Sequence, residues 1–344
     1  MITKVFARAA QALEVVGQRF SAKALILGYH RVQDLENDPW SMCVSPRNFE
    51  QHLDVLRRTA QPLGLRQLAE SHRRGKVPDR GVVLTFDDGY ADNLTMAVPL
   101  LERYEAPATM FITTGQIGAR NEFWWDELER ILLIPDRLPE QLHLTIDAEP
   151  CSWNLVSASN YSSEQRHQDR RVKAWEAKPG TRLHFYYSVW DRLRRAAPTA
   201  RRGLLDKILE WADTDPNPRS THRALTTREL ENLAVNRLIE IGAHTVSHLF
   251  LPHYPTAEQH TEIAGSKRYL EDLLGASISS FAYPHGEYNE ETLRIVRGVG
   301  FETACTLGER AVWKYSHRLR YPRCCVEDWN GDEFEKRIRN WFDG

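Results

Sequence analysis

Cysteine, long apolar runs and an excess of charge of one sign are all scarce in this sequence. Its 344 residues include five cysteines, an odd number, and no two are spaced as Cys-x-x-Cys. Reduced thiols are therefore favoured over a disulfide framework. The formal net charge is only −2, so the composition gives no sign of nucleic-acid binding. No apolar run approaches the length of a transmembrane helix, and no integral membrane segment is expected.

The first 22 residues carry apolar side chains at roughly helical spacing and predict an amphipathic helix over 1–22. The longest uncharged run of this stretch, between Arg8 and Glu14, has five residues. That run is too short for the core of a signal peptide. We expect the helix either to pack on the protein surface or to attach weakly to a membrane surface. The sequence thus favours a cytoplasmic protein, with peripheral membrane association as the alternative.

Short β-like runs alternate with helical segments along most of the chain. Ser45 followed by Pro46 marks the start of one such helix. Alternation of this kind is typical of parallel β/α units. We therefore predict an α/β fold, a distorted (β/α) barrel of about seven or eight strands within residues 23–344. The strand-like runs cover residues 24–30, 81–86, 108–114, 238–244, 277–284, 301–307 and 319–326.

A segment over residues 120–223 interrupts this alternation. It contains several helical runs and one possible strand at 142–147. Between Tyr161 and Gly203, nine arginines and two lysines occur with only two aspartates and two glutamates. We interpret 120–223 as a helical, basic insertion that serves as a lid over the barrel mouth, as a dimer contact, or as both. Its charge is either a solvated face or an attraction for an anionic substrate.

Polar residues follow several of the predicted strands at the point where each strand ends. His30 follows the first strand, Asp87 and Asp88 follow the second, and His244 and His248 follow the fourth. Because the carboxyl ends of parallel barrel strands converge on one face, we expect these side chains to meet. Two histidines and one carboxylate are a common ligand set for a catalytic divalent metal. The other carboxylate would then stand beside a metal-bound water and take its proton.

The stretches around Asp87 and Asp88 and around His244 and His248 resemble motifs of the polysaccharide deacetylase family. This family is carbohydrate esterase family 4, which shares the chitooligosaccharide deacetylase (NodB) homology domain. The resemblance covers about residues 23–118 and 225–330. It implies a distorted (β/α) barrel and metal-dependent hydrolysis of an N-acyl, less often an O-acyl, group on a sugar. The matching stretches are TFDDG at 85–89 for the first motif, HTVSH at 244–248 for the second, FAYPHG at 281–286 for the third and GFETACT at 300–306 for the segment after it.

The resemblance also implies roles for individual residues. By position, Asp87 matches the general base, and Asp88, His244 and His248 match the metal ligands. Zn²⁺ is the first expectation for the metal, with Co²⁺ or Ni²⁺ as alternatives that suit the same ligands. The metal would polarise the acyl carbonyl and present the water, and a backbone N–H near Pro284–His285 would help to hold the oxyanion.

Three features depart from the family pattern. Ala282 stands where the family often has an arginine that orients the base. Arg323, at the end of the last predicted strand, is either its replacement in space or a structural ion-pair partner. The late histidine that serves as general acid has no clear match, but His30 lies where circularly shuffled members place it. His30 is then either that acid or a structural histidine. His285 occupies a position that is often Tyr, and it either contacts substrate or packs.

Aromatic side chains are candidates for sugar contacts, because the C–H faces of sugars pack on aromatic rings. Trp124 and Trp125 in the insertion and Tyr283 in the third motif lie near the expected barrel mouth. The alternative for the two tryptophans is a place in a helical core.

We therefore predict a cytoplasmic, metal-dependent hydrolase that removes an N-acetyl or other small N-acyl group from an amino sugar or glycan. An intracellular nucleotide-linked or lipid-linked sugar, used in surface-polysaccharide or glycoconjugate biosynthesis, is the favoured substrate. One alternative is a deformylase or an O-acyl esterase that uses the same site. Another is a carbohydrate-binding barrel without catalysis. Nucleic acid is not an expected partner, and the sequence leaves the oligomeric state open.

Overall fold

The computed structural model describes residues 21–343 and divides the chain into two units. The first unit comprises residues 21–34, 43–114 and 227–343, and the second comprises 35–42 and 115–226. The predicted N-terminal helix lies, except for its last two residues, outside the described part of the chain. None of the helices described is long and apolar enough to cross a bilayer.

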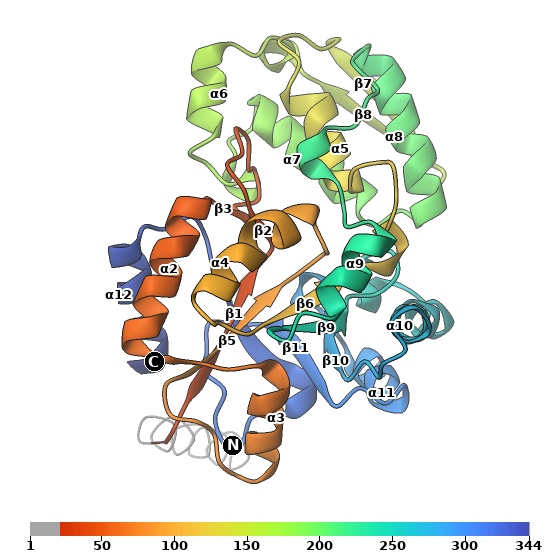
Figure 1. The fold of residues 1–344 in the computed structure, drawn as a ribbon. Coiled ribbons are helices and arrows are strands. Elements are labelled where there is room, and N and C mark those ends of the chain that lie inside the picture. Colours follow the sequence, from red (N-terminus) through yellow and green to blue (C-terminus); the bar gives the residue numbers. More distant parts are fainter. Residues whose placement is uncertain (1–20, 344) are drawn as a thin grey trace, which may run out of the picture. The chain divides into compact units, whose positions relative to one another are not determined.

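Parallel strands of the first unit form a closed barrel (Figure 1). β1 pairs with both β12 and β5, and this double pairing closes the sheet. A short strand, β4 (Gln61–Pro62), adds an extra pairing to β5. The predicted (β/α) barrel is confirmed, with seven barrel strands among the described residues. In order around the barrel they are β1 (Ala24–Tyr29), β12 (Tyr321–Cys325), β11 (Thr303–Leu307), β10 (Ser280–Ala282), β9 (Ile239–Ala243), β6 (Ala108–Ile112) and β5 (Gly81–Phe86).

The barrel strands are apolar runs without alternation because both of their faces are covered. β1, β5 and β6 are buried at every position, as expected for parallel strands that have a packed interior on one side and helices on the other. Each of the seven barrel strands falls within a run predicted from the sequence. The predicted run at 81–86 matches β5, and the other predicted runs extend one to three residues beyond one or both ends of their strands.

Helices surround the barrel strands of the first unit (Figure 1). α2 starts as predicted, since Ser45 Oγ accepts the N–H of Asn48 and Pro46 takes the first helical position. After β5, the chain passes through a π-helical turn, Asn93–Ala97, into α4 (Val98–Arg103). The other helices of this unit are α2 (Pro46–Thr59), α3 (Leu65–Arg73), α9 (Thr227–Ala234), α10 (Thr256–Leu274), α11 (Glu290–Gly298) and α12 (Gly331–Asp343).

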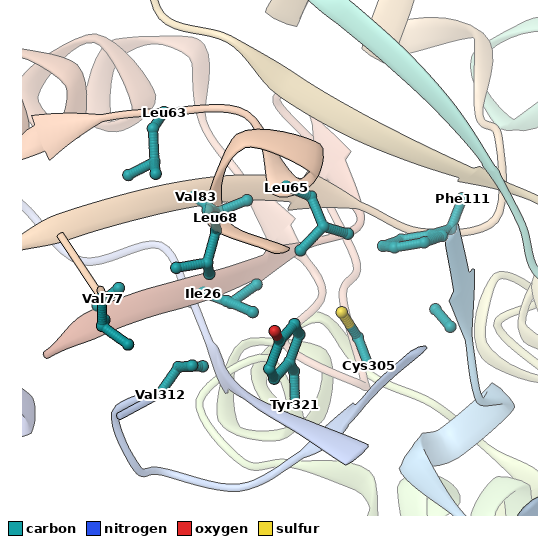
Figure 2. Packing of buried hydrophobic residues seen from close by; sticks show 12 residues of the cluster. Ile26, Leu63, Leu65, Leu68, Val77, Val83, Phe111, Cys305, Val312 and Tyr321 are labelled. Atoms are coloured by element: carbon teal, nitrogen blue, oxygen red, sulfur yellow. The ribbon is translucent and has the colours of Figure 1, made fainter. Parts of the chain in front are cut away.

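A cluster of buried apolar side chains holds the barrel together. Figure 2 shows the cluster, whose members come from six barrel strands, from the segment around α3 and, with Val312, from the loop between β11 and β12. Burial of one such aliphatic side chain stabilises the fold by about 1.5–3 kcal/mol. The strand ends that carry the polar residues therefore project from a rigid framework. The cluster consists of Ala24, Ile26, Leu63, Leu65, Leu68, Val77, Val83, Phe111, Ala282, Cys305, Val312 and Tyr321.

The second unit is a helical body with one β-hairpin. The possible strand at 142–147 is present as β7 (Gln141–Ile146), which pairs in antiparallel fashion with β8 (Glu149–Asn154). Buried Arg182 donates hydrogen bonds to main-chain carbonyls, among them that of Leu132. The helices of this unit are α5 (Trp124–Leu133), α6 (Ser163–Asp169), α7 (Arg182–Leu193) and α8 (Pro198–Ala212).

Candidate active site

Polar side chains gather at the carboxyl ends of three barrel strands. His30 directly follows β1, Asp87 and Asp88 directly follow β5, and His244 directly follows β9, with His248 one turn further along. Parallel strands end on the same face of a barrel. Residues that are far apart in the sequence are thereby brought into one group, with ionisable atoms less than 4 Å apart.

Asp88, His244 and His248 form a set that can hold a divalent cation. Their ligand atoms lie within 4.8 Å of one another. Asp88 Oδ1 is 3.7 Å from His244 Nε2 and 3.4 Å from His248 Nε2. All three residues are nearly buried. Two imidazole nitrogens and one carboxylate oxygen suit Zn²⁺, Co²⁺ or Ni²⁺ and leave room for further ligands, so the donor set fits a catalytic metal.

A hydrogen bond to the main chain fixes the ring of His244. Its Nδ1 lies 2.8 Å from the carbonyl oxygen of Ala282. A carbonyl only accepts, so Nδ1 carries the proton and Nε2 presents its lone pair toward Asp88, as is usual for a metal-binding histidine. Burial also lowers the pKa of His244, which favours the neutral ring that a metal requires. Ala282 thus contributes through its carbonyl at the position where the family often has an arginine.

The main chain around this group is strained. Four residues other than glycine adopt left-handed conformations: Asp88 (φ +73°), Thr245 (+63°), His248 (+54°) and His285 (+57°). Such a conformation costs an L-residue about 1–2 kcal/mol. Strained residues of this kind cluster at functional sites, where the surrounding structure holds them. Their coincidence with the ligand set therefore supports a functional role for this end of the barrel.

Glu262 of α10 holds the loop that carries the two histidines. Its Oε2 accepts the N–H groups of Val246 at 3.0 Å and Ser247 at 2.7 Å. Within the loop, Thr245 Oγ1 accepts the N–H of His248 at 3.0 Å. Glu262 is itself buried. These bonds offset the strain of the loop and fix the direction of both imidazoles.

Asp87 forms a two-pronged ion pair with Arg323 of β12. The Nη1–Oδ1 and Nη2–Oδ2 distances are 2.6 and 2.7 Å, and Nη1 also donates to Thr85 Oγ1 at 3.2 Å. Burial raises the pKa of Asp87, but the charges of Arg323, His244 and His30 outweigh burial and bring its pKa well below the ordinary value. Asp87 is therefore a carboxylate with a fixed orientation. The sequence left two roles open for Arg323. This geometry favours the first, in which Arg323 takes the place of the arginine that orients the base in the family, over a purely structural ion pair.

His30 is the most accessible histidine of the group that contains His244 and His248. Its Nε2 is 3.9 Å from Asp87 Oδ2, and 22% of its side chain is exposed. Burial lowers the pKa of His30 to about 4; Asp87 opposes that effect, and Arg323 adds to it. A partly exposed imidazole beside the base is placed to exchange a proton with a bound substrate.

The loop after β1 holds His30 in place. Asn93 Nδ2 donates to the carbonyl oxygen of His30 at 2.9 Å. Next in the chain, Arg31 pairs with Asp92 at 2.8 Å and its guanidinium lies over the ring of Tyr90. All these partners follow β5, so the ends of β1 and β5 are tied together on either side of the group.

The third motif supplies main-chain atoms more than side chains. Tyr283 is fully buried, its hydroxyl donates to the carbonyl oxygen of Leu319 at 2.9 Å, and its N–H donates to that of Cys305. Because the ring is fully buried, these contacts favour a packing role for Tyr283 over the predicted sugar contact. Pro284 has no N–H, so within the predicted stretch only His285 could supply the oxyanion donor.

The imidazole of His285 packs beside the ligand set. It stacks on Phe250 with ring centroids 3.5 Å apart and meets the ring of His248 edge to face at 4.6 Å. Gly286 follows it with φ +69°, and a Cβ there would lie 2.5 Å from Leu307 Cγ. The turn 284–286 is thereby held close to β11, and the side chain of His285 supports His248.

Trp124 and Trp125 belong to α5 of the second unit. Trp125 is buried and stacks on Phe123, while the ring of Trp124 stacks on Trp190 and lies under the guanidinium of Arg201. This packing supports the helical-core alternative for both tryptophans.

Most of the arginines that give residues 161–203 their positive charge have partners within the second unit. Arg182 and Arg201 donate to main-chain carbonyls. These contacts favour a structural role of the charge over attraction of an anionic substrate. The ion pairs are Arg166 with Asp136, Arg170 with Glu36, Arg194 with Asp191, and Arg202 with Glu127 and Asp206.

Sequence reasoning did not identify Glu262, although a signal was present. Gln259, Glu262 and Ser266 recur at helical spacing and are buried on α10, among apolar residues. A polar stripe on the buried face of a helix needs partners, and here the partners include the loop that carries the histidines. Nothing in the sequence could indicate the role of the Ala282 carbonyl, because every residue carries a main-chain carbonyl.

Three comparisons place the chain among known proteins. The family model for polysaccharide deacetylase matches residues 74–168 and 214–304, together more than half of the chain. A poly-beta-1,6-N-acetyl-D-glucosamine N-deacetylase of Staphylococcus aureus is 23% identical over 334 residues, covering 92% of this chain and 82% of that protein. The Escherichia coli K12 protein of the same name is 37% identical over 288 residues, covering 82% of this chain but 33% of that protein.

A solved structure supports the fold. The Streptococcus pyogenes deacetylase PplD, in complex with acetate, superposes with a TM-score of 0.57 and 17% identity. The match covers 92% of this chain and 99% of that one.

Proposed function

Because this chain belongs to the polysaccharide deacetylase family, we propose that it is a metal-dependent N-deacetylase of a β-1,6-linked N-acetylglucosamine polymer. The observation that carries the proposal is the ionised Asp87, oriented by Arg323, beside the set of Asp88, His244 and His248. The names of the two relatives support the choice of polymer.

The residues of the site divide the work of amide hydrolysis. Asp88, His244 and His248 would hold the cation, with Zn²⁺ as the first choice. When bound, such an ion acts as a Lewis acid and lowers the pKa of water. Asp87 accepts the proton of the attacking water at a carboxylate oxygen, and its pair with Arg323 keeps that oxygen aimed and ionised. The N–H of His285 donates to the oxyanion of the acetyl group.

His30 completes the reaction as the proton donor. The bond between the acetyl carbon and the sugar nitrogen breaks, and the nitrogen leaves as an amine only if it gains a proton. His30 Nε2, 3.9 Å from Asp87 Oδ2 and partly exposed, is placed to take up the proton that Asp87 accepts from the water and to pass it to this nitrogen. The products are acetate and a glucosamine unit.

The alternatives differ in how well the site supports them. A complete ligand set beside an ionised carboxylate favours catalysis over a binding barrel. Removal of an O-acyl or a formyl group uses the same atoms and is a second outcome of the test below. The predictions of a cytoplasmic location and of a nucleotide-linked or lipid-linked substrate depend on the N-terminal residues, which lie outside those described, and they stay predictions.

The test measures amine release from N-acetylglucosamine oligomers with β-1,6 linkages, from the free sugar and from a nucleotide-linked form. The metal content is determined for the wild type, Asp87→Asn, and Asp79→Asn as an exposed control. We expect release from the oligomers, with Asp87→Asn keeping its metal but losing roughly 100-fold or more of the rate. Metal binding without release from any sugar would favour the binding barrel. Equal release by Asp87→Asn would remove Asp87 as the base.

A further inference from the structure

A groove of about 800 Å³ lies at the opposite end of the barrel from Asp87 and the histidines. Its walls come from the residues that precede β11 and β12 and from the C-terminal ends of α3 and α11. Parallel strands begin at this end, so none of the residues in the proposed catalytic mechanism takes part. The groove belongs entirely to the first unit.

Positive charge dominates this groove. Arg73, Arg297, Lys314 and Arg318 line it and are exposed. Of the described residues, Glu302 is the one carboxylate in the lining, and it pairs with Arg73 at 2.9 Å.

The charges of the groove sum to a positive excess once its carboxylate and the nearby helix ends are counted. The C-terminal ends of α3 and α11 each contribute about half a negative charge. Together with Glu302 they leave an excess of about two positive charges. Within the described part of the chain, neither Arg297 nor Arg318 forms an ion pair, so this excess is open to a ligand.

Two further side chains give the groove hydrogen-bonding and ring surfaces. His317 Nδ1 accepts the N–H of Leu319 at 3.1 Å, so the proton of the neutral ring is on Nε2. Burial and the charges of Arg320, Arg297 and Arg318 lower the pKa of His317, and the charge of Glu290 opposes them without reversing the shift. Tyr315 stands at the rim with 71% of its surface exposed.

We propose that this groove binds a ligand with a phosphate or diphosphate group, with Arg297 and Arg318 as the anchoring residues. A guanidinium matches two phosphate oxygens at once. A phosphate monoester carries close to two negative charges near pH 7, which equals the excess, whereas one carboxylate would leave half of it unbalanced. The volume suits a small ligand or a headgroup.

The positive stretch at 161–203 is a weaker candidate for the same chemistry. Most of its arginines are held by carboxylates or carbonyls of the second unit. In the groove, by contrast, Arg297 and Arg318 have no such partner among residues 21–343. A phosphate-bearing molecule would thus bind on the barrel face remote from the chemistry.

Calorimetry with pyrophosphate tests the proposal on the full chain freed of metal, because pyrophosphate chelates divalent cations and would otherwise also bind at the site of Asp88, His244 and His248. The groove variant is R297E/R318E. The control is R228E/R294E, which makes the same change of charge at exposed arginines outside the lining. We expect the groove variant to bind pyrophosphate at least about tenfold more weakly and the control to bind like the wild type. Thermal unfolding checks that both variants are folded, and deacetylation should be unchanged in both. The test thus stands apart from that of the catalytic proposal.

Vesicles distinguish the source of the phosphate. If phosphatidic acid vesicles, but not phosphatidylcholine vesicles, sediment the wild type and the control but not the groove variant, the ligand is a lipid headgroup. If pyrophosphate binds without sedimentation, the ligand is soluble. The proposal is overturned if the wild type binds neither probe, or if the groove variant binds them as the wild type does.

Discussion

The guanidinium group of Arg323 holds both carboxylate oxygens of Asp87, at 2.6 and 2.7 Å. The two residues meet because β5 and β12 flank β1 in the closed barrel. The pair orients the proposed base and keeps it ionised while both residues are buried.

Replacement of Arg323 is expected to affect stability and the pH profile together. Arg323→Met leaves a buried carboxylate without its partner, which should lower the free energy of unfolding by about 3–5 kcal/mol. The pKa of Asp87 should rise, because the charge that lowers it is gone. The acid limb of kcat/KM should then move to higher pH, less so in Arg323→Lys. Urea unfolding and pH-rate profiles measure both effects.

The double variant D87N/R323M is the control for this pair. It removes both charges, so it should be more stable than the sum of the single changes implies. Strict additivity, with an unchanged pH profile in Arg323→Lys, would contradict a coupled pair.

The variant His30→Ala is expected to show whether His30 acts as the proton donor or only supports the structure of the site. An amide needs protonation of its leaving nitrogen, but an activated aryl acetate does not. Deacetylation of the glycan should therefore fall by roughly 100-fold or more, with little change in aryl acetate hydrolysis. His260→Ala, at an exposed position, should affect neither reaction. Equal losses on both substrates would assign His30 to the structure of the site instead.

Glu262→Gln is expected to weaken metal binding rather than chemistry. The neutral amide accepts the N–H groups of Val246 and Ser247 less strongly than the carboxylate does, so the histidine loop should loosen. We expect metal affinity to fall by about tenfold or more, with kcat largely restored at saturating metal. Glu258→Gln, one turn earlier and exposed, is the matched control. A low kcat at full metal occupancy would show that Glu262 acts on catalysis directly.

His52 should make the fold sensitive to acid. It is buried, lies 2.6 Å from the carbonyl oxygen of Trp329 and stacks on Phe334. Burial lowers its pKa from 6.5 to about 4, although Trp329 and Asp328 oppose this effect. Between pH 6.5 and 4 the unfolded chain binds the proton and the folded one does not. The stability from this residue is thus present above pH 6.5 and is lost as pH falls through 4.

The His52→Gln variant checks that contribution. The loss of stability between pH 7 and 4 should be smaller in this variant by up to about 3 kcal/mol, since one pKa unit corresponds to 1.36 kcal/mol. Denaturant midpoints at the two pH values give the difference, and the exposed His260→Gln should behave like the wild type. The same pH dependence in all three proteins would show that His52 does not control it.

The sequence by itself determined the barrel strands and the residues that could form the site. Strands covered on both faces are local apolar runs, and polar residues that end such runs stand out. Asp87, Asp88, His244 and His248 could therefore be named from the sequence, because topology alone brings strand ends to one face. The group they form in the structure is the one that this rule predicts.

Tertiary structure alone decided which partners these residues have. Arg323 reaches Asp87, and not another acid, because of the strand order around the barrel. The Glu262 carboxylate and the Ala282 carbonyl hold the histidines from elements that no local pattern links to them. Tyr283 faces the interior although its motif lies at the site. Hydrogen bonds and ion pairs depend on distances of a few ångströms between segments far apart in the chain, and periodicity carries no such information.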